Sequence, residues 1–456
     1  MTAGGSPSPR LLALKALIAV DERGAFANLS IERVSANSLS SAETLRGSAD
    51  KALLVQLVYG TVSMKLALDF QLNRLLQRPL ETLPTAIRNI LRLGAYQIMY
   101  LAKVPRHAAV DEAVKLAHRF GHVGTSRLVN AVLRRLTQAD LFTWPEQSED
   151  LVHYLSVRYS HPPFLVTRYL QRLGAHETES LLCVNNLPPR FSIRANTTRM
   201  SVQDLAVHLK ARNITVEDGR YVPEILYPVP TPSFADELFT AGLYSVQGEA
   251  SAMCAHFLSP EPHERVVDLC AAPGGKATHL AELMGDQGEI FAFDRNAKRL
   301  QLVAENATRL GLKSIRPIHK AAHEALGVTG EVKKVLLDAP CSGFGVLRHK
   351  PDLRWRHNDD SVRELAANQR AMILSAAKLV ARGGTLVYSV CTTEPEETTA
   401  VVEHLLSERP DFKVAETMPA RFRQALSSGE GPGFYVWPHR DQIDGFYIAT
   451  LQRAGI

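Results

Sequence analysis

The chain contains few cysteines, and none of them stands at the spacing of a zinc site. Its five cysteines are odd in number and spread over 456 residues, which argues against a disulfide framework, and the lack of a Cys-x-x-Cys pair argues against a structural metal. No apolar run approaches the roughly 20 residues of a membrane span. The amino terminus lacks the basic and apolar regions of a secretory signal. We expect a cytoplasmic protein with reduced thiols, no metal and no membrane partner.

The net charge is also small. The 52 basic and 47 acidic residues leave a charge of +5, which alone does not indicate a nucleic-acid partner. Between residues 88 and 135, however, only Asp111 and Glu112 oppose nine basic residues. This cluster predicts a surface for a polyanion, although solvated helix faces would give the same pattern. The nine residues are Arg88, Arg92, Lys103, Arg106, Lys115, Arg119, Arg127, Arg134 and Arg135.

Apolar residues recur at intervals of three and four from about residue 10 to 138. This spacing is typical of amphipathic helices. It predicts an all-α domain over 6–140, with Thr125 or Ser126 as the N-cap of the helix that contains residues 128–136. Because the chain is too long for one ordinary core, further domains are expected after it.

The helical pattern breaks at 142–146, where a linker is expected. A strand at 190–194 and a helix at about 201–211 follow. They predict a small α/β connecting subdomain over 145–235.

From 236 to 454 short apolar segments alternate with amphipathic helices. This alternation predicts an α/β domain with a Rossmann-like, doubly wound parallel sheet. The expected strands are 265–269, 289–293, 315–318, 334–337, 385–390 and 446–450.

The turn after the first of these strands is rich in glycine and opens a helix, an arrangement that suits a ligand with a negative end. A Walker A loop is excluded, because Cys270 replaces its first glycine and Ala277 replaces its Ser/Thr. The Gly-x-Gly-x-x-Gly fingerprint of dinucleotide sites is absent. Asp294 ends the second strand 19 residues after Gly275 (294 minus 275), near the spacing of a ribose-binding acid. A nucleoside cofactor with a ribose diol is therefore expected.

Two cysteines, Cys341 and Cys391, stand where neighbouring parallel strands should end. Ligands bind at this edge of an α/β sheet, so both thiols should face one reacting atom. Methyl transfer from a sulfonium donor to C5 of cytosine needs such groups. A thiolate that adds to C6 makes C5 nucleophilic, and a second thiol assists release after the C5 proton leaves. Asp338 would serve the N3 edge, where negative charge develops.

Three segments resemble the signature motifs of the NOL1/NOP2/Sun family of RNA cytosine-C5 methyltransferases. They are Asp268 to Lys276, Asp338 to Gly343 and Tyr388 to Glu397, and further matches are Val246 to Ser251, Arg348 to Trp355 and Asp444 to Tyr447. The resemblance implies that Cys391 is the nucleophile and Cys341 the assisting cysteine. It places S-adenosylmethionine at Cys270, Ala271, Ala272, Pro273, Gly274, Gly275, Lys276, Asp294 and Asp338.

Other parts of the chain refine this resemblance. Residues 104–114 and 128–135 are similar to the NusB-like helical RNA-binding domain, and Pro189, Arg190, Arg194 and Asn196 resemble the motif of the family's RNA-side subdomain. This fusion is typical of the bacterial 16S rRNA branch of the family. It implies methylation of cytidine 967 of 16S rRNA, in naked RNA or an early assembly intermediate, by a monomeric enzyme.

Two positions depart from the family pattern. Ala321 and Ala322 follow the third strand where the family has an Asp-Ala pair. A carboxylate contact to the cofactor is therefore missing, and we predict weaker or differently arranged cofactor binding. Val390 stands before the implied nucleophile where the family commonly has Thr, which changes the hydrogen bonds available to the base.

Two alternatives are compatible with the sequence. The same chemistry could act on tRNA, because the motifs specify the base and not the RNA around it. A NusB-like RNA-binding factor with a vestigial catalytic domain is the other alternative, which the altered segment at Ala321 favours.

Overall fold

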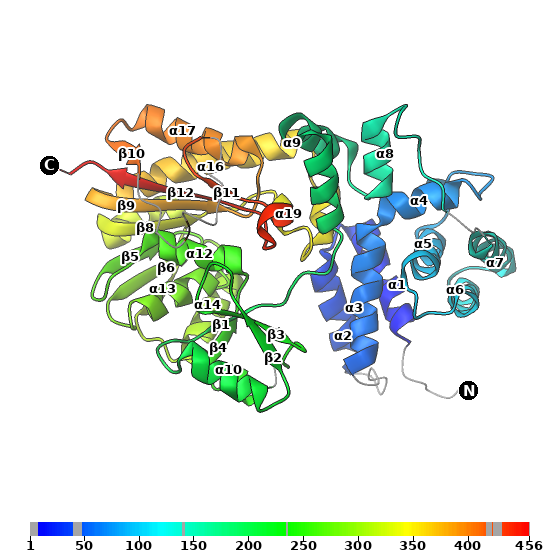
Figure 1. Ribbon diagram of the computed structural model, residues 1–456, viewed down its shortest axis with the longest axis horizontal. Coiled ribbons are helices and arrows are strands. Elements are labelled where there is room, and N and C mark those ends of the chain that lie inside the picture. Colours follow the sequence, from blue (N-terminus) through cyan, green and yellow to red (C-terminus); the bar gives the residue numbers. More distant parts are fainter. Residues whose placement is uncertain are drawn as a thin grey trace. The chain divides into compact units, whose positions relative to one another are not determined.

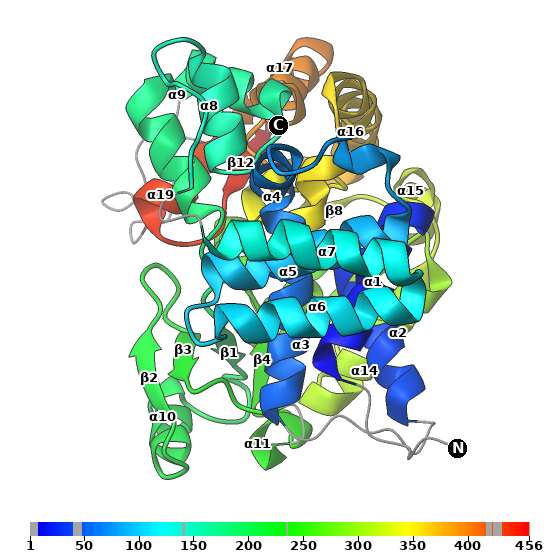
Figure 2. The same ribbon diagram turned by 90° about the vertical axis from the view of Figure 1, so that its right-hand side faces the viewer.

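The computed structural model describes residues 8–39, 48–138, 142–233, 236–415, 422 and 431–455. The chain forms two compact units (Figures 1 and 2). We call Met1–Leu187 with Leu347–Arg356 the helical unit, and Pro188–Val346 with His357–Ile456 the sheet unit. The predicted fold class, with an all-α part, a small sheet subdomain and an α/β domain, is confirmed.

The helical unit is built around one apolar core. Helices α6 and α7 pack against each other and against α5 (Figure 2). Helix α1 begins where Ser8 accepts a hydrogen bond from the Leu11 amide and ends at Gly24 in the left-handed conformation. The helices are α1 Pro9–Arg23, α2 Ala27–Leu39, α3 Ser48–Ser63, α4 Lys65–Asn73, α5 Thr85–Tyr100, α6 Arg106–Phe120, α7 Val123–Thr137, α8 Leu151–Arg158 and α9 Pro163–Val184, with short 3-10 turns η1 Leu80–Thr82 and η4 Pro351–Trp355.

The predicted N-cap of α7 was wrong. The helix begins at Val123, and His122 is its cap, because its ring accepts a hydrogen bond from the Gly124 amide. Thr125 returns a bond by accepting from the His122 amide. Histidine is not a preferred N-cap, so the sequence gives no strong signal for it. Thr and Ser are preferred N-caps, and the prediction was therefore placed three or four residues too late in the chain.

The segment Leu347–Arg356 belongs to the helical unit although it lies far along the chain. Arg354 is fully buried and donates to the carbonyls of Ser160 (3.0 Å) and Asn185 (3.3 Å). The Trp355 indole donates to the carbonyl of Val62 at 2.8 Å. Backbone acceptors of the helical unit therefore fix this segment in place.

The sheet unit begins with a small antiparallel sheet in the order β2-β3-β1-β4. The predicted strand and helix at 190–211 are present, and three further strands complete the sheet. Helices α8 and α9 precede this sheet in sequence but lie in the helical unit. The elements are β1 Ile193–Ala195, α10 Val202–Lys210, β2 Thr215–Asp218, β3 Ile225–Val229, α11 Glu237–Thr240 and β4 Tyr244–Val246.

The large sheet has the order β10-β12-β9-β8-β5-β6-β7, and β11 pairs with β12. All six predicted strands are present. The last of them, β12, is antiparallel to β9 rather than parallel. The strands are β5 Arg265–Asp268, β6 Glu289–Asp294, β7 Ile315–His319, β8 Val332–Asp338, β9 Val380–Val390, β10 Phe412–Val414, β11 Phe434–Val436 and β12 Phe446–Arg453.

Helices cover both faces of this sheet. Figure 1 shows α12, α13 and α14 on one face and α16 and α17 on the other. The helices are α12 Glu249–Leu258, α13 Gly275–Leu283, α14 Ala297–Leu310, α15 Leu326–Thr329, α16 Asp359–Leu379, α17 Thr399–Glu408 and α19 Pro438–Asp441. The sheet is therefore doubly wound, and the loops that leave its parallel strands meet at one edge.

Within the described residues, no single helix is long and apolar enough to cross a membrane. Ala49–Ser63 and Lys65–Asn73 reach that length and composition only together, across a bend of 71°.

Candidate active site

Neighbouring parallel strands carry the two predicted cysteines. Strand β8 lies between β5 and β9, Cys341 follows β8, and Cys391 follows β9. Their sulfur atoms are 3.4 Å apart. Asp338, the last residue of β8, lies opposite Ser389 in β9. The structure therefore brings together the two thiols and the carboxylate that the sequence placed at this edge.

The Asp338 carboxylate is held from two sides. Lys276 Nζ lies 2.8 Å from its Oδ2, and the Ser389 hydroxyl donates to its Oδ1 at 3.0 Å. Burial opposes the charge of Lys276, but Asp338, with smaller contributions from Cys254 and Cys391, raises the pKa of Lys276 above its ordinary value. A fixed cation therefore lies beside the cysteine loops, where it favours negative charge on the Cys391 sulfur.

The surroundings of Cys341 disfavour its thiolate. The hydrogen bond with Cys391 raises the pKa of Cys341 well above its ordinary value, and burial and the carboxylates of Glu397 and Asp338 add to this effect. Either sulfur can donate in the 3.4 Å contact between them, and the raised pKa favours Cys341 as the cysteine that donates. This arrangement suits Cys391 as the thiolate of the pair.

A buried carboxylate, Glu397, holds the loop that carries Cys341. It accepts hydrogen bonds from the Ser342 amide (2.9 Å), from the Ser342 hydroxyl and from Gln369 Nε2 (3.0 Å). Gln369 also donates to the carbonyl of Pro340 at 2.8 Å. Burial raises the pKa of Glu397, and the bonds from Ser342 and Gln369 oppose that rise. The cysteine loop is therefore anchored on both sides of Cys341.

The same network reaches the second cysteine. The Ser342 hydroxyl lies 2.9 Å from that of Thr392, the residue after Cys391. Sequence reasoning assigned no role to Glu397 or Gln369. The signal for Glu397 was its place in the segment Tyr388 to Glu397 that carried the family resemblance. For Gln369, inside a helix, there was no signal.

The glycine-rich turn after β5 packs closely against α14 and leads directly into α13. Gly274 has a φ of 107°, and a Cβ there would lie 3.1 Å from the backbone of Val303. Helix α13 begins at Gly275 without a side-chain cap, so its first amides remain available for a negative group. Arg299 fixes the turn by donating to the Ala272 carbonyl at 2.6 Å.

The predicted ribose acid lies on the adjacent strand. Asp294 ends β6, and one of its oxygens accepts the Asn296 amide at 2.8 Å. The amide of Ala271 bonds to the carbonyl of Phe293, which ties the turn to the end of β6 at 2.9 Å. A helix terminus and an acid at neighbouring strand ends fit a nucleoside cofactor that carries a carboxylate.

Arg194 and Asn196, which resembled an RNA-side motif, are both fully buried. Arg194 donates to both oxygens of Glu282 at 2.8 and 2.7 Å, and to the carbonyl of Gly275 at 2.9 Å. Neither side chain can reach RNA. Arg194 instead stabilises the first turn of α13 through its hydrogen bond to the Gly275 carbonyl. Burial raises the pKa of Glu282, and Arg194 opposes that rise.

One group of potential metal ligands lies in the sheet unit. The ligand atoms of Glu224, His256 and His279 lie within 4.8 Å of one another. Burial lowers the pKa of His279 well below its ordinary value, and the Arg194 guanidinium lowers it further. The positive charge beside these residues disfavours a cation, and we assign no metal to them.

The basic cluster of the helical unit is smaller than the sequence indicated. Arg92 is buried, with its guanidinium bonded to both oxygens of Asp69 at 2.7 Å and to Asp21 at 2.9 Å. Arg88 lies 3.5 Å from Asp21. These two arginines therefore stabilise the fold and are not available to bind a polyanion. The exposed members are Lys103, Arg106, Lys115, Arg119, Arg127, Arg134 and Arg135.

The segment after β7 offers no acid at the position where the family has one. Ala321 is the N-cap of a short 3-10 turn, and its amide donates to Glu324 at 2.8 Å. The one carboxylate of this turn is thus bonded to its own backbone. The prediction of altered cofactor binding rests on this segment.

Family models match three parts of the chain. A model described as 16S rRNA methyltransferase RsmB/F matches residues 255–452, one for the NusB family matches 7–138, and one for the ferredoxin-like domain of RsmF/B-like methyltransferases matches 161–228. The probable ribosomal RNA small subunit methyltransferase B of Bacillus subtilis (strain 168) is 35% identical over 456 residues, which cover 98% of this chain and 99% of the relative. The chain belongs to the RsmB/F family of 16S rRNA methyltransferases.

Other members and solved structures agree with this assignment. The ribosomal RNA small subunit methyltransferase B of Klebsiella pneumoniae (strain 342) is 31% identical over 406 residues, 88% of this chain and 90% of the relative. The crystal structure of PH0851 matches with a TM-score of 0.81 at 28% identity, over 98% of this chain and 99% of that one. NSun6 from Pyrococcus horikoshii, solved with SFG, matches with a TM-score of 0.59 at 25% identity, over 65% of this chain and 99% of that one.

Proposed function

We propose that this RsmB/F family member transfers a methyl group from S-adenosylmethionine to C5 of a cytidine in 16S rRNA, through a covalent bond between Cys391 and C6. The observation that carries the proposal is the 3.4 Å distance between the Cys391 and Cys341 sulfurs at the ends of adjacent parallel strands. A noncatalytic RNA-binding protein would not need two thiols at this edge beside a fixed lysine.

Each residue has a distinct part in this mechanism. The Cys391 thiolate adds to C6, and the resulting enamine makes C5 nucleophilic. Lys276 supplies the positive charge that balances the negative charge developing at the N3 edge, and Asp338, 2.8 Å away, holds Lys276 at that position. After a base removes the C5 proton, Cys391 leaves, and the S–H of Cys341 stabilises the departing thiolate.

The turn after β5 and Asp294 would hold S-adenosylmethionine. The amides at the start of α13 suit its carboxylate, and Asp294 suits its ribose hydroxyls. When bound, it supplies an electrophilic methyl group. The target base must leave its stack to meet that group and both thiols. The exposed cations of the helical unit would contact phosphates of the same RNA.

The test is bisulfite sequencing of unmodified 16S rRNA after incubation with the protein and S-adenosylmethionine. We expect one protected cytidine, at position 967 by analogy with the family, and no protection with Cys391→Ala. Cys341→Ala should retain methyl transfer and accumulate a protein–RNA adduct, because release is slowed. Full turnover by Cys391→Ala would overturn the mechanism, and protection of tRNA instead of 16S rRNA would overturn the substrate.

We further propose that the protein acts as a cytoplasmic monomer, on naked 16S rRNA or an early assembly intermediate. The mechanism needs reduced thiols, which a reducing compartment maintains. Comparison of naked 16S rRNA with complete small subunits as substrates tests the assembly stage. Faster methylation of the complete subunit would contradict it.

A further inference from the structure

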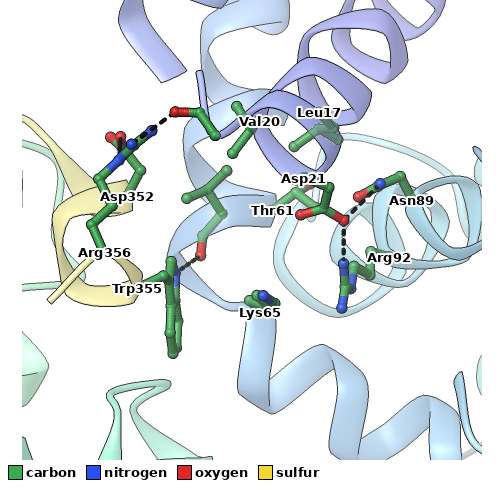
Figure 3. A pocket seen from close by; sticks show the side chains of 12 residues that line it. Leu17, Val20, Asp21, Thr61, Lys65, Asn89, Arg92, Asp352, Trp355 and Arg356 are labelled. Carbon is green, nitrogen blue, oxygen red and sulfur yellow. Dashed lines mark hydrogen bonds and ion pairs between the residues drawn. The ribbon is translucent and has the colours of Figure 1, made fainter. Parts of the chain in front are cut away.

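The helical unit contains a cavity that the proposed mechanism does not use (Figure 3). Its volume is about 200 Å³. Side chains from α1, α3, α4 and α5 surround it, together with the segment 352–356. A volume below the usual 300–1,000 Å³ of drug-sized sites suits a single small ring or a small ion.

Most charges around the cavity are already paired. Arg92 is bonded to Asp21 and to Asp69. Arg356 donates to Asp352 at 2.8 Å and to the carbonyl of Gly24 at 2.8 Å. The two arginines form part of the wall of the cavity, and most of their donors are already used.

Lys65, Thr61 and the Trp355 ring differ from these paired groups. Within the described part of the chain, Lys65 Nζ has no hydrogen-bond acceptor and no carboxylate within ion-pair distance, and it lies 5.7 Å from the centre of the Trp355 ring. Thr61 is 2% exposed, and its hydroxyl has no hydrogen-bond partner among these residues. Burial and, next, Arg92 lower the pKa of Lys65. A desolvated cation, a hydroxyl and an aromatic ring therefore face one small space.

We propose that this cavity, the Lys65 pocket, binds one unstacked nucleobase of a single-stranded RNA segment, with the base against Trp355 and an acceptor of its edge facing Lys65. The inference rests on the proposed function, in which the partner is RNA. Aromatic rings bind unstacked bases of any sequence, because every base has a π-face.

The charges around the pocket favour a base over a phosphate. Asp21 and Asp352 line the cavity together with Lys65, and their carboxylates repel an anion. The hydrogen bonds that Asp21 accepts from described residues go to its Oδ2, so its Oδ1 can accept from a base amine. A nucleobase carries donors and acceptors on one edge, which matches a wall with both a carboxylate and an ammonium.

The test measures the affinity of the full chain for two fluorescein-labelled probes by anisotropy. One is a single-stranded cytidine decamer, and the other is a ribose-phosphate decamer without bases. We expect the wild type to prefer the cytidine decamer by about tenfold, within the range for stacking of one base on an aromatic ring. Lys65→Met should reduce this preference, because the edge of the base loses its donor while the Trp355 ring remains. Lys15→Met, which removes an exposed charge from α1, should leave the preference within twofold.

Two further measurements separate contact with a base from contact with a phosphate. The salt dependence of cytidine decamer binding should be unchanged by Lys65→Met, whereas loss of a phosphate contact would reduce the slope by about one. Trp355→Phe, which retains a ring, should keep more of the preference than Trp355→Leu, with unfolding temperatures measured for both.

An unchanged preference in Lys65→Met, or an equal loss of affinity for both decamers, would overturn the inference. Bisulfite sequencing with the same proteins separates this failure from failure of the proposed function. Methylation by the wild type without a base preference in the decamers would reject the pocket and leave the enzyme activity standing.

Discussion

Among the residues that the structure describes, each unit completely buries one arginine, but the two units surround that charge differently. In the sheet unit Arg194 lies against Glu282, so the buried charges cancel. In the helical unit Arg354 donates to the carbonyls of Ser160 and Asn185 and to the side chain of Asn186, and no carboxylate among the described residues pairs with it. Burial lowers the pKa of Arg354 to about 9.

The lysines repeat the contrast. Lys276 is paired with Asp338, whereas Lys65 has no such partner among the described residues. In the sheet unit, charge is arranged to hold groups in place for chemistry. In the helical unit, Arg354 and Lys65 lack a carboxylate partner among the described residues, which is costly unless a ligand or water contacts these groups.

We expect the largest effect on activity from a substitution that breaks the ion pair between Lys276 and Asp338. Lys276→Met should slow methyl transfer by about a hundredfold to a thousandfold, the usual effect of losing one group that stabilises developing charge. Single-turnover rates at saturating RNA are the measurement. Lys333→Met removes an exposed lysine from the adjacent strand β8 and serves as the control. An equal loss in both variants would show that general charge, and not this ion pair, matters.

The two arginines can be compared through stability. Arg194→Met leaves the Glu282 carboxylate buried without its partner and should cost about 3–5 kcal/mol in urea unfolding. Arg354→Met leaves only carbonyl and amide acceptors behind, and should cost about 1–3 kcal/mol. The double variant Arg194→Met, Glu282→Gln should recover part of the loss. An Arg354 variant less stable than the Arg194 variant would reverse the comparison.

The smallest expected effect concerns the position of the cysteine loops. Glu397→Gln should lower kcat about tenfold with KM for RNA unchanged, because Ser342 and Thr392 lose their shared anchor. Removing the carboxylate charge should also lower the pKa of Cys341, since Glu397 raises it.

Alkylation with iodoacetamide in the Cys391→Ser background measures that shift. The pH at which Cys341 becomes reactive should be lower with Glu397→Gln than without it. A purely structural role for Glu397 would change kcat and leave this pH profile in place.

The strands of the large sheet could be predicted from the sequence, because most of them are short apolar runs between amphipathic helices. Sequence reasoning missed β2, Thr215–Asp218, in which Val216 is the one apolar residue and the other three are exposed. It also missed β10 and β11, each of three residues. Such segments become strands only because a neighbour supplies the hydrogen bonds.

The sequence predicted those residues of the candidate site that directly follow a strand. Cys341 and Cys391 follow adjacent strands, so topology alone places them together. Glu397 and Ser342 are 55 residues apart in the chain, and no local pattern links them. The burial of Arg194 was equally invisible, because arginine is ordinarily an exposed residue. Contacts between buried residues far apart in the chain therefore cannot be predicted from periodicity and spacing.

The membership of Leu347–Arg356 in the helical unit has a consequence for the order in which this protein is made. A ribosome synthesises the described helices α1 to α9 of that unit first, yet the segment with Arg354 and Trp355 follows only after the 159 residues from 188 to 346. Until then the carbonyls of Ser160 and Val62 have to be satisfied by water. The unit that begins to fold first therefore depends on a part of the chain translated during the middle of the methyltransferase domain, so neither unit is finished before synthesis has passed Arg356.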